Sequence, residues 1–354
     1  MRIALDATYS VDPHASGIAI YSRELMAGLA EKFPREQFLH CYRPKQWTRA
    51  PRAADTTVRR RLLLPAIPTF RADVFHALNQ RVDSRPTRAV VSTFHDLFVM
   101  TGQYSSAEFR KRFTAQARRA AANSDRIIAV SQFTADLVAD LLQFDRSRIR
   151  VVYHGVNPPD HSFEASRENT VLFVGALQIR KNVSRLVEAF ERIPSDWRLV
   201  LAGSTHGYGA DQIIERIARS PARERITMPG YLPRSELDRL YATASIFAFP
   251  SLDEGFGIPV LDAMAHGVPV VTSSRSSSTS MPSAMAEIAG DAAVFVNPEN
   301  TDEIAAALAR LMKDPDLRET LSRRGRERAR LYTWDRAVSE TYQVYRDANP
   351  KRYF

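Results

Sequence analysis

The stretch PSLDEGFGIPVLDAMAHGVPVVTS, residues 250–273, says most about the fold of this 354-residue chain. It predicts a strand that ends at Pro250, a loop of small and acidic residues, a helix that begins near Pro259, and a second strand over Val268–Thr272. A strand, a helix and a strand in succession are typical of a parallel sheet. Seven serines follow in the eleven residues Ser273–Ser283, and they predict a mobile loop.

The loop of this stretch carries residue types that suit a phosphorylated ligand rich in hydroxyls. Gly255 and Gly257 allow a ligand to approach the backbone, and the amides at the start of the helix favour an anion such as a diphosphate. Glu254 and Asp262 lie eight positions apart, so both carboxylates could accept hydrogen bonds from vicinal hydroxyls of one ligand. An acidic loop that only caps the helix is the alternative.

A second segment, VLFVGALQIRKN at residues 171–182, also predicts an anion site. A buried strand runs into a turn at Gly175 and delivers Arg180 and Lys181 immediately before a helix. Two adjacent cations together with helix-start amides are typical of a diphosphate site. A solvated basic pair is the alternative.

The rest of the chain alternates between short apolar runs and helix-length segments, which predicts parallel sheets covered on both faces. The strands expected in the N-terminal half are Arg2–Ala7, Val74–Ala77, Ala89–Thr93, Arg126–Val130 and Ile149–Tyr153. Those expected in the C-terminal half are Thr170–Val174, Trp197–Ala202, Arg225–Met228, Ile246–Phe249, Val268–Thr272 and Ala292–Val296. We therefore expect two doubly wound, Rossmann-like α/β domains facing a central cleft, with the cleft as the ligand site.

The polar segment after the Pro158–Pro159 pair predicts the boundary between these domains. The expected N-terminal domain covers residues 1–163, and the apolar stripe near the C-terminus predicts that a helix at 334–354 completes it. The expected C-terminal domain covers residues 164–333.

These segments resemble the family 4 retaining glycosyltransferases, which have the GT-B fold. EGFGIPVLDAMA, residues 254–265, resembles the family hallmark of two glutamates separated by seven residues, with Asp262 in place of the second glutamate. Arg180 and Lys181 match the family's Arg-Lys pair, and GYLP, residues 230–233, resembles the loop whose backbone contacts the nucleotide base. The resemblance covers essentially the whole chain and is sharpest over residues 171–297.

The N-terminal half adds matches of its own. HASGIAIYSREL resembles the family's glycine-rich first loop, in which Gly17 would approach the donor phosphates; an ordinary turn before a helix is the alternative. FHDL resembles a motif whose histidine, here His95, faces the donor sugar; a structural histidine is the alternative. Ser131 is expected to cap a helix, and His154, where relatives commonly have Asn, is interpreted as neutral.

The resemblance implies a set of site residues. The implied catalytic residues are His95, Arg180, Lys181 and Glu254, and the implied donor-binding residues are Gly17, Gly175, Arg180, Lys181, Tyr231, Leu232, Glu254, Gly255, Phe256, Gly257 and Asp262. No metal is expected, because the two cations would stabilise the leaving diphosphate and the lone Asp-x-Asp string, at 314–316, ends a helix.

The implied reaction is retaining transfer of a hexose, of the mannose or glucose type, from a nucleotide diphosphate sugar to a saccharide or lipid-linked acceptor. Synthesis of a cell-surface polysaccharide or glycolipid is the expected setting. The donor is a substrate, so no cofactor is expected, and GDP-mannose is preferred over a UDP-hexose. Residues 1–163 would form the acceptor side and residues 164–333 the donor side. A nucleotide-sugar epimerase and a non-catalytic sugar-nucleotide-binding protein are the alternatives.

The net charge of +9 is unevenly distributed. Residues 1–160 hold 24 Lys and Arg against 15 Asp and Glu, an excess of +9, whereas residues 161–354 hold 25 of each kind. A basic half indicates an anionic partner: a membrane surface, a phosphorylated acceptor or nucleic acid. Nucleic acid is not expected, because the chain has no zinc-finger spacing, RNP-type aromatic motif or basic tail.

The helix expected over Ser106–Ala122 carries five basic residues together with Phe109 and Phe113, and it could lie on an anionic membrane. A solvated helix whose phenylalanines face the core is the alternative. Cys41, the single cysteine, is expected to be a small buried residue, and Met1–Thr8 predicts a strand rather than a signal peptide. The expected location is cytoplasmic, with peripheral contact at the inner face of the membrane as an open question.

Overall fold

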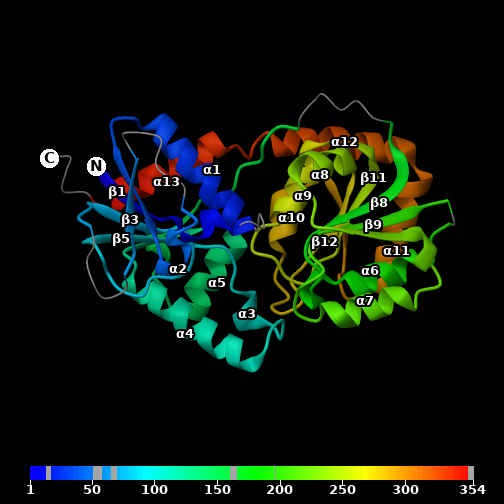
Figure 1. Ribbon diagram of the computed structural model, residues 1–354. Coiled ribbons are helices and arrows are strands. Elements are labelled where there is room, and N and C mark those ends of the chain that lie inside the picture. Colours follow the sequence, from blue (N-terminus) through cyan, green and yellow to red (C-terminus); the bar gives the residue numbers. More distant parts are fainter. Residues whose placement is uncertain (13–16, 51–57, 65–69, 160–165, 195, 350–354) are drawn as a thin grey trace. The chain divides into compact units, whose positions relative to one another are not determined.

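The computed structural model describes residues 1–12, 17–50, 58–64, 70–159, 166–194 and 196–349, and the chain divides into two units (Figure 1). Unit 1 comprises Met1–Met100, Ala107–Gly155 and Thr333–Phe354, and unit 2 comprises Thr101–Ser106 and Val156–Tyr332. Each unit contains one parallel sheet with helices on both faces, so the expected pair of doubly wound α/β domains is confirmed.

The sheet of unit 1 has seven parallel strands in the order β3-β2-β1-β4-β5-β6-β7. The strands are β1 (Arg2–Asp6), β2 (Gln37–Tyr42), β3 (Val58–Leu62), β4 (Val74–Ala77), β5 (Ala89–Phe94), β6 (Arg126–Ala129) and β7 (Ile149–Val151). The strand order reverses between β1 and β4, and open parallel sheets bind their ligands at such a switch point.

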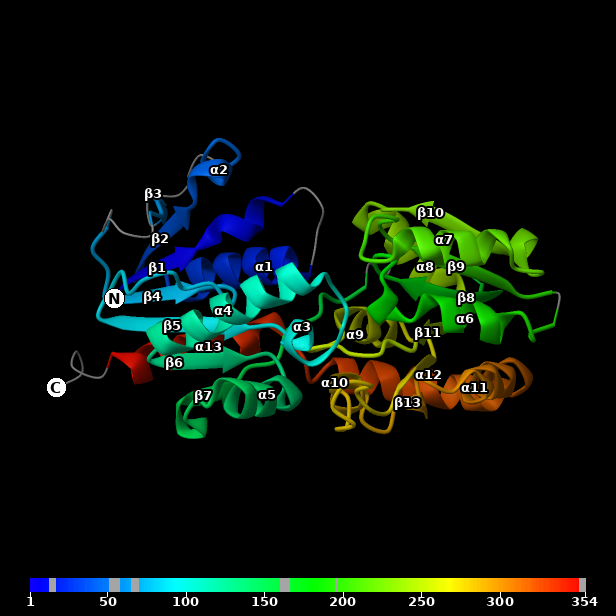
Figure 2. The same ribbon diagram turned by 90° about the horizontal axis from the view of Figure 1, so that it is seen from below.

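Two pairs of helices cover this sheet. On one face lie α1 (Gly17–Lys32) and α13 (Trp334–Ala348), and on the other lie α4 (Ala107–Asn123) and α5 (Gln132–Leu142) (Figures 1 and 2). Shorter elements in the loops are η1 (Ala7–Val11), α2 (Pro44–Trp47), α3 (Phe98–Thr101) and η2 (Arg146–Arg148). Ser131 caps α5 by accepting a hydrogen bond from the Thr134 amide, as expected.

The sheet of unit 2 has six parallel strands in the order β10-β9-β8-β11-β12-β13. The strands are β8 (Glu168–Val174), β9 (Arg198–Ala202), β10 (Ile226–Gly230), β11 (Ala244–Phe249), β12 (Val270–Ser273) and β13 (Ala293–Val296). Every residue of β11 is buried because helices cover both faces of the sheet. The order reverses between β8 and β11, so the loops that follow these two strands meet at the switch point.

Helices cover both faces of this sheet as well (Figures 1 and 2). On one face lie α6 (Val183–Phe190), α7 (Ala210–Ala218) and α11 (Thr301–Lys313), and on the other α8 (Arg234–Thr243), α9 (Ile258–Ala265) and α12 (Pro315–Ala329). The remaining elements are η3 (Ile179–Lys181), η4 (Arg223–Arg225) and α10 (Ala284–Ala289).

The boundary between the units differs from the expected one at 163/164. It falls after Gly155, where a Cβ would lie 2.2 Å from the Trp334 backbone nitrogen, so the chain segments that enter and leave unit 1 are in close contact. The next amide, Val156, donates to the Tyr332 carbonyl at 3.1 Å.

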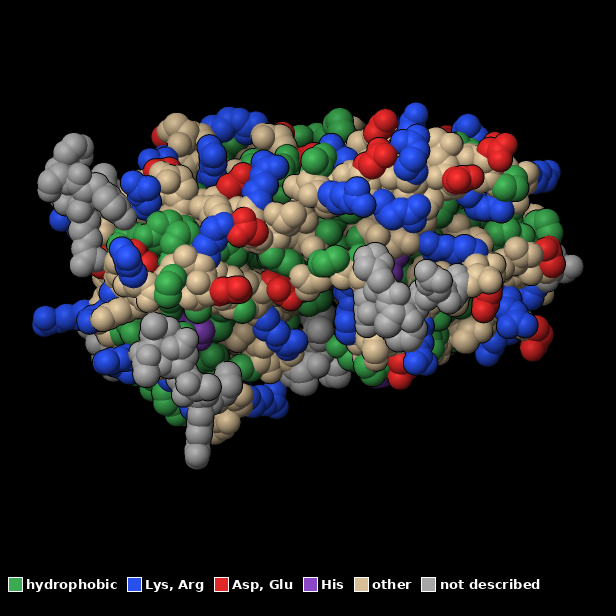
Figure 3. All heavy atoms as spheres, turned by 90° about the horizontal axis from the view of Figure 1, so that it is seen from above, with side chains coloured by type: hydrophobic (Ala, Val, Ile, Leu, Met, Phe, Trp, Pro, Cys, Tyr) green, Lys and Arg blue, Asp and Glu red, His purple; other side chains and the backbone are tan. Residues whose placement is uncertain are grey.

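The charges on one face of the molecule are mixed in sign. On the face drawn in Figure 3, Lys and Arg side chains are interspersed with Asp and Glu. Cys41 is buried, as expected. Among the described residues, none of the helices combines the length and the apolar character needed to cross a membrane.

Candidate active site

The loops after β8 and β11 bring together three of the predicted residues. The Oε1 atom of Glu254 lies 2.7 Å from Arg180 Nη1 and 2.5 Å from Lys181 Nζ. The Ser251 hydroxyl donates to the same oxygen at 2.8 Å. We call Arg180, Lys181 and Glu254 the ionic triad of unit 2; it lies where the strand order of the sheet reverses.

Backbone geometry fixes the triad in place. Arg180 and Lys181 lie in η3, and Asn182, in the left-handed conformation, immediately precedes α6. The Asn182 side chain donates to the carbonyls of Pro250 and Pro298, at 2.9 and 2.6 Å, and so ties the basic loop to the acidic one. A Cβ on Gly203 would lie 2.2 Å from the Gly175 carbonyl oxygen, so the turns after β8 and β9 pack backbone against backbone.

The triad holds its charges in a buried setting. Burial would raise the pKa of Glu254, but Arg180 and Lys181 outweigh it and lower the pKa to about 2. Glu254 is therefore ionised at neutral pH, and the triad carries a net charge of +1. Lys181 also lies over the Phe249 ring, with Nζ 4.6 Å from the ring centroid.

Asp253 turns away from the triad. Its carboxylate accepts hydrogen bonds from Tyr104 and from Ser276, and burial raises its pKa. Ser283 caps α10, and Ser273, Ser276 and Ser283 are all buried. The serine segment is thus tied down by its own hydroxyls, which differs from the mobile loop that its composition predicted.

The start of α9 follows the triad directly. Gly255, Phe256 and Gly257 connect Glu254 to the helix, and Gly257 adopts φ 102°, a conformation that favours glycine. Phe256 is buried and packs edge-on against Tyr332 at 6.2 Å between ring centroids. The helix begins at Ile258, close to the expected start at Pro259.

Asp262 belongs to a separate group of charges. It lies 3.3 Å from Arg234 Nη1, and Arg234 also pairs with Asp238 at 2.9 Å. Burial raises the pKa of Asp262, and Arg234 opposes that rise. Asp262, which we expected to bind the same ligand as Glu254, therefore has a cationic partner of its own. This partner, Arg234, was missed in the sequence analysis. The signal was present, because Arg234 comes immediately after GYLP.

The GYLP turn links this second group to β10. Gly230 ends the strand with φ 78°, and Tyr231 is 47% exposed. Leu232 is half-buried, and α8 begins two residues later at Arg234. The loop expected to contact a base therefore leads directly to the cation that holds Asp262.

In unit 1, His95 follows β5 and is buried. Its Nε2 lies 2.9 Å from the Leu78 carbonyl, and its ring packs against Tyr21 at 4.8 Å and His154 at 5.5 Å between ring centroids. Burial lowers the pKa of His95 to about 4, although the bond to Leu78 opposes this. His95 is therefore neutral at pH 7. His154, interpreted above as a neutral replacement, is a buried member of this cluster.

Gly17 is the first residue of α1 and is exposed. The residues that precede it in the HASG motif, 14–16, lie outside the described residues.

Two family models match adjoining parts of the chain. The model described as "Glycosyl transferases group 1" matches residues 159–328, and the model described as "Glycosyltransferase Family 4" matches residues 17–159. An O-antigen chain mannosyltransferase B from Escherichia coli is 29% identical over 298 residues, which cover 79% of this chain and 76% of that protein. The O-antigen chain mannosyltransferase RfbU from Salmonella typhimurium is 27% identical and covers 54% of this chain and 52% of that protein.

Solved structures share the fold. A sucrose-phosphate synthase from Thermosynechococcus elongatus matches with a TM-score of 0.78 and 22% identity over 98% of both chains. WaaG, a glycosyltransferase involved in lipopolysaccharide biosynthesis, matches with a TM-score of 0.70 and 14% identity over 98% of this chain and 99% of that one. The chain therefore has the GT-B fold of glycosyltransferases. Within that class it belongs to the family 4 type, as the sequence motifs predicted.

Proposed function

We propose that this protein is a retaining hexosyltransferase that takes its sugar from a nucleotide diphosphate donor. The observation that carries the proposal is the ionic triad at the switch point of unit 2, where two cations share one carboxylate oxygen. Such a group can exchange part of its internal pairing for the oxygens of a diphosphate without moving the backbone.

The proposed chemistry uses the diphosphate itself as the base. The bond between the sugar C1 and the phosphate oxygen breaks while the acceptor oxygen bonds to C1 on the same face. The hydroxyl proton of the acceptor passes to the departing phosphate oxygen. Arg180 and Lys181 stabilise the negative charge that develops on that phosphate, and Glu254 accepts hydrogen bonds from hydroxyls of the donor sugar.

The proposed nucleotide end of the site is the second charge group. Asp262 would accept hydrogen bonds from the ribose hydroxyls, and Tyr231 and Leu232 would lie against the base. The backbone from Gly255 to Gly257, with the amides at the start of α9, would face the diphosphate. Gly175, where β8 ends, leaves room for it. His95 and Gly17 of unit 1 stay proposed contacts of the donor sugar and phosphates.

We favour GDP-mannose as the donor over a UDP-hexose. Two of the sequence relatives are named O-antigen chain mannosyltransferases, which supports mannose as the sugar and a cell-surface saccharide, free or lipid-linked, as the acceptor. No cofactor or metal is proposed, since the two cations of the triad would supply the charge stabilisation.

Helix α4 supports a proposed contact with anionic membrane at the inner face. Phe109 is 41% exposed and stacks on Phe113 at 6.2 Å between centroids, and Arg112 lies over the Phe109 ring. The buried residues of the helix are alanines. Sedimentation with anionic vesicles at low salt is the expected result, and a Phe109→Ser variant should weaken it.

A panel of nucleotide sugars tests the proposal. Thermal unfolding with GDP, UDP and their sugars should single out one base, because a ligand at a hundredfold excess over Kd stabilises the fold by about 2.7 kcal/mol. Transfer to an acceptor should persist in EDTA, and NMR of the product should show the α-anomer. An isomerised donor in the absence of acceptor would indicate an epimerase, and binding without turnover a non-catalytic protein.

A further inference from the structure

A pocket lies wholly within unit 1, at the carboxyl edge of its sheet. Thr8 and Tyr9 reach it from the turn after β1, Arg43 from the end of β2 and Arg81 from the loop after β4. Its volume is about 580 Å³, which suits a small ligand. The strand order reverses between β1 and β4, so the loops that follow these strands lie at the position where doubly wound sheets bind their ligands.

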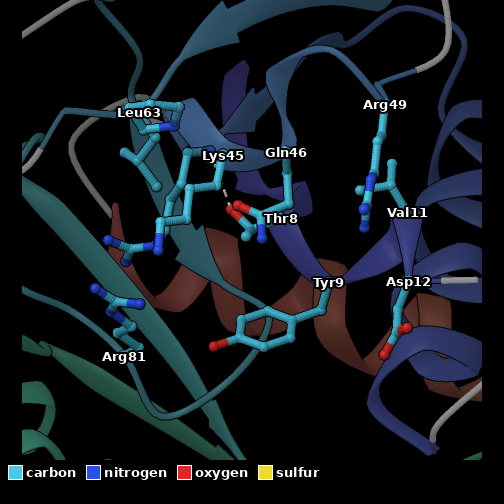
Figure 4. Close-up of a pocket in the computed structure, with 11 residues that line it drawn as sticks. Thr8, Tyr9, Val11, Asp12, Lys45, Gln46, Arg49, Leu63 and Arg81 are labelled. Atoms are coloured by element: carbon cyan, nitrogen blue, oxygen red, sulfur yellow. Dashed lines mark hydrogen bonds between the residues drawn. The ribbon is translucent and has the colours of Figure 1, made fainter. Parts of the chain in front are cut away.

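Cations dominate the lining of this unit 1 pocket. Among the described residues that line it, four side chains are basic and one, Asp12, is acidic; the basic ones are Arg43, Lys45, Arg49 and Arg81. Figure 4 shows Arg81 and Arg49 on opposite sides of the pocket, with the ring of Tyr9 lying between them. A neutral ligand would gain little from this lining, whereas an oxyanion could be contacted from two sides.

Arg43 is built into the wall. Its side chain is buried and reaches Asp83 at 2.7 Å and Asp6 at 3.5 Å, and its backbone amide donates to the Thr8 hydroxyl at 3.2 Å. Its Nε is buried and has no hydrogen-bond partner among the described residues. Asp6 and Asp83 thus hold the guanidinium in the wall, where it adds positive charge beside the pocket.

Lys45 and Arg49 are the two basic residues of the pocket that no described carboxylate neutralises. Both are exposed and form no ion pair with any described residue, whereas Arg43 and Arg81 share Asp83. Helix α2 holds Lys45, and Arg60 fixes this helix by donating to the Trp47 carbonyl at 2.9 Å and lying over its ring at 4.5 Å. Lys45 is therefore presented by an anchored helix, and Arg49 follows two residues after the end of that helix.

We propose that the unit 1 pocket binds a phosphate group carried by the saccharide acceptor. This inference rests on the proposed function, because it assigns the acceptor to the unit that does not hold the triad. Lys45 and Arg49 contact the phosphate oxygens, Arg43 adds positive charge in the pocket wall, and Tyr9 lies against the sugar ring. His95, the proposed contact of the donor sugar, follows β5, the next strand beyond β4, so the acceptor pocket lies at the same edge of the sheet as that contact.

Calorimetry with small probes tests this assignment. Mannose 1-phosphate should bind at least about tenfold more tightly than mannose, because charge-assisted hydrogen bonds are lost with the phosphate. The double variant Lys45→Gln/Arg49→Gln should lose this preference. The control variant Arg35→Gln/Arg150→Gln also removes two exposed positive charges from unit 1, but neither residue lines the pocket. It should retain the preference for mannose 1-phosphate.

Further binding measurements distinguish the unit 1 pocket from the proposed donor site in unit 2. GDP and UDP should stabilise the Lys45→Gln/Arg49→Gln variant as they stabilise the wild type, since those nucleotides belong to unit 2. Tighter binding of the octyl phosphodiester of mannose than of mannose 1-phosphate would identify a lipid-linked acceptor, and equal binding a soluble one; both support the proposal.

Three results would overturn it. They are equal binding of mannose and mannose 1-phosphate, equal loss of phosphate binding in the control variant, and loss of nucleotide binding in the Lys45→Gln/Arg49→Gln variant. The last result would assign the pocket to the donor. Failure of nucleotides to bind the wild type would instead contradict the proposed function. The comparison of mannose 1-phosphate with mannose would still test whether the unit 1 pocket binds a phosphate.

Discussion

A single carboxylate oxygen of Glu254 receives donors from Arg180, Lys181 and Ser251. This arrangement keeps two cations close together without their mutual repulsion, because the anion lies between them. Breaking a buried pair by removing one partner is costly, and here each cation leaves another behind to compensate Glu254. The protein can therefore lose one cation of the triad and still fold.

Lys181→Ala should lower turnover about 10²-fold or more, because one donor to the developing phosphate charge is lost. Thermal unfolding should show that the protein remains folded. Steady-state kinetics with the preferred donor make the measurement, with Arg219→Ala, an exposed partner of Glu215 on α7, as the control. Near-normal turnover in Lys181→Ala would remove the triad from the chemistry.

Asp262→Asn should weaken donor binding about tenfold, since a charged hydrogen-bond acceptor for the ribose is worth about 1.5–3 kcal/mol. Asp262→Glu keeps the charge beside Arg234 and should bind the donor within about threefold of wild type. Calorimetry with the nucleoside diphosphate measures both. Unchanged affinity in the Asn variant, or complete loss of activity in the Glu variant, would dissociate Asp262 from the ribose.

At the scale of elements, apolar patterning predicted most strands that are buried on both faces, but it missed β2, in which four of six residues are buried. Strand β11 is one that it predicted, and each of its residues is buried. Patterning also missed β3, which has the sequence VRRRL with no fully buried residue, and α12, in which only Leu321, Gly325 and Ala329 are buried. Elements at an edge or on a surface bury too little to leave a period in the sequence.

The candidate site was predictable to a similar extent. The residues of the triad follow two buried strands and belong to family motifs. The sequence therefore predicted correctly that they lie close together. The pairing of Asp262 with Arg234, and of Asp253 with Tyr104 and Ser276, depends on the direction in which each side chain points in the folded chain. No spacing rule encodes that direction.

Three buried histidines, His76 in β4, His95 after β5 and His154 after β7, should make unit 1 sensitive to acid. Burial lowers the pKa of His76 to about 3 and of His95 to about 4, and it lowers that of His154 well below its ordinary value. Between pH 6.5 and these values the unfolded chain binds protons that the folded chain does not. Each histidine then removes about 1.4 kcal/mol of stability per pH unit as the pH falls.

Hydrogen exchange at pH 7.5 and pH 5.5 measures this effect in each unit separately. Unit 1 should lose protection at the lower pH, although Asp6, whose pKa burial raises, opposes the trend. Glu254 in unit 2 has a lowered pKa, so its contribution to stability is complete above pH 4.5 and does not change in this window. Equal protection of unit 1 at both pH values would show that the histidines titrate normally.

At the scale of the whole molecule, the last helix belongs to the first unit. Helix α13 packs on α1, where a Cβ on Gly28 would lie 2.6 Å from Val338 Cγ2. Tyr345 bonds to His76 at 2.7 Å, and Tyr342 stacks on Phe33 at 3.8 Å between centroids. Unit 1 therefore completes its core only after unit 2 has been synthesised.

Truncation after Tyr332 should unfold unit 1 and spare unit 2. The buried side chains of Val338, Val344 and Tyr345 together contribute about 5–9 kcal/mol, comparable with the stability of a whole domain. Calorimetric unfolding should lose one transition, while a nucleoside diphosphate still stabilises the other. Truncation after Asn349 is the control and should retain both transitions. Two intact transitions in the shorter chain would contradict the role of α13.

A crystal structure of the protein with a nucleotide diphosphate sugar tests the central claim most directly. We predict diphosphate oxygens within hydrogen-bond distance of Arg180 and Lys181, sugar hydroxyls at Glu254 and the ribose at Asp262. A donor bound at any other surface, with Arg180 and Lys181 contacting only Glu254, would contradict the account.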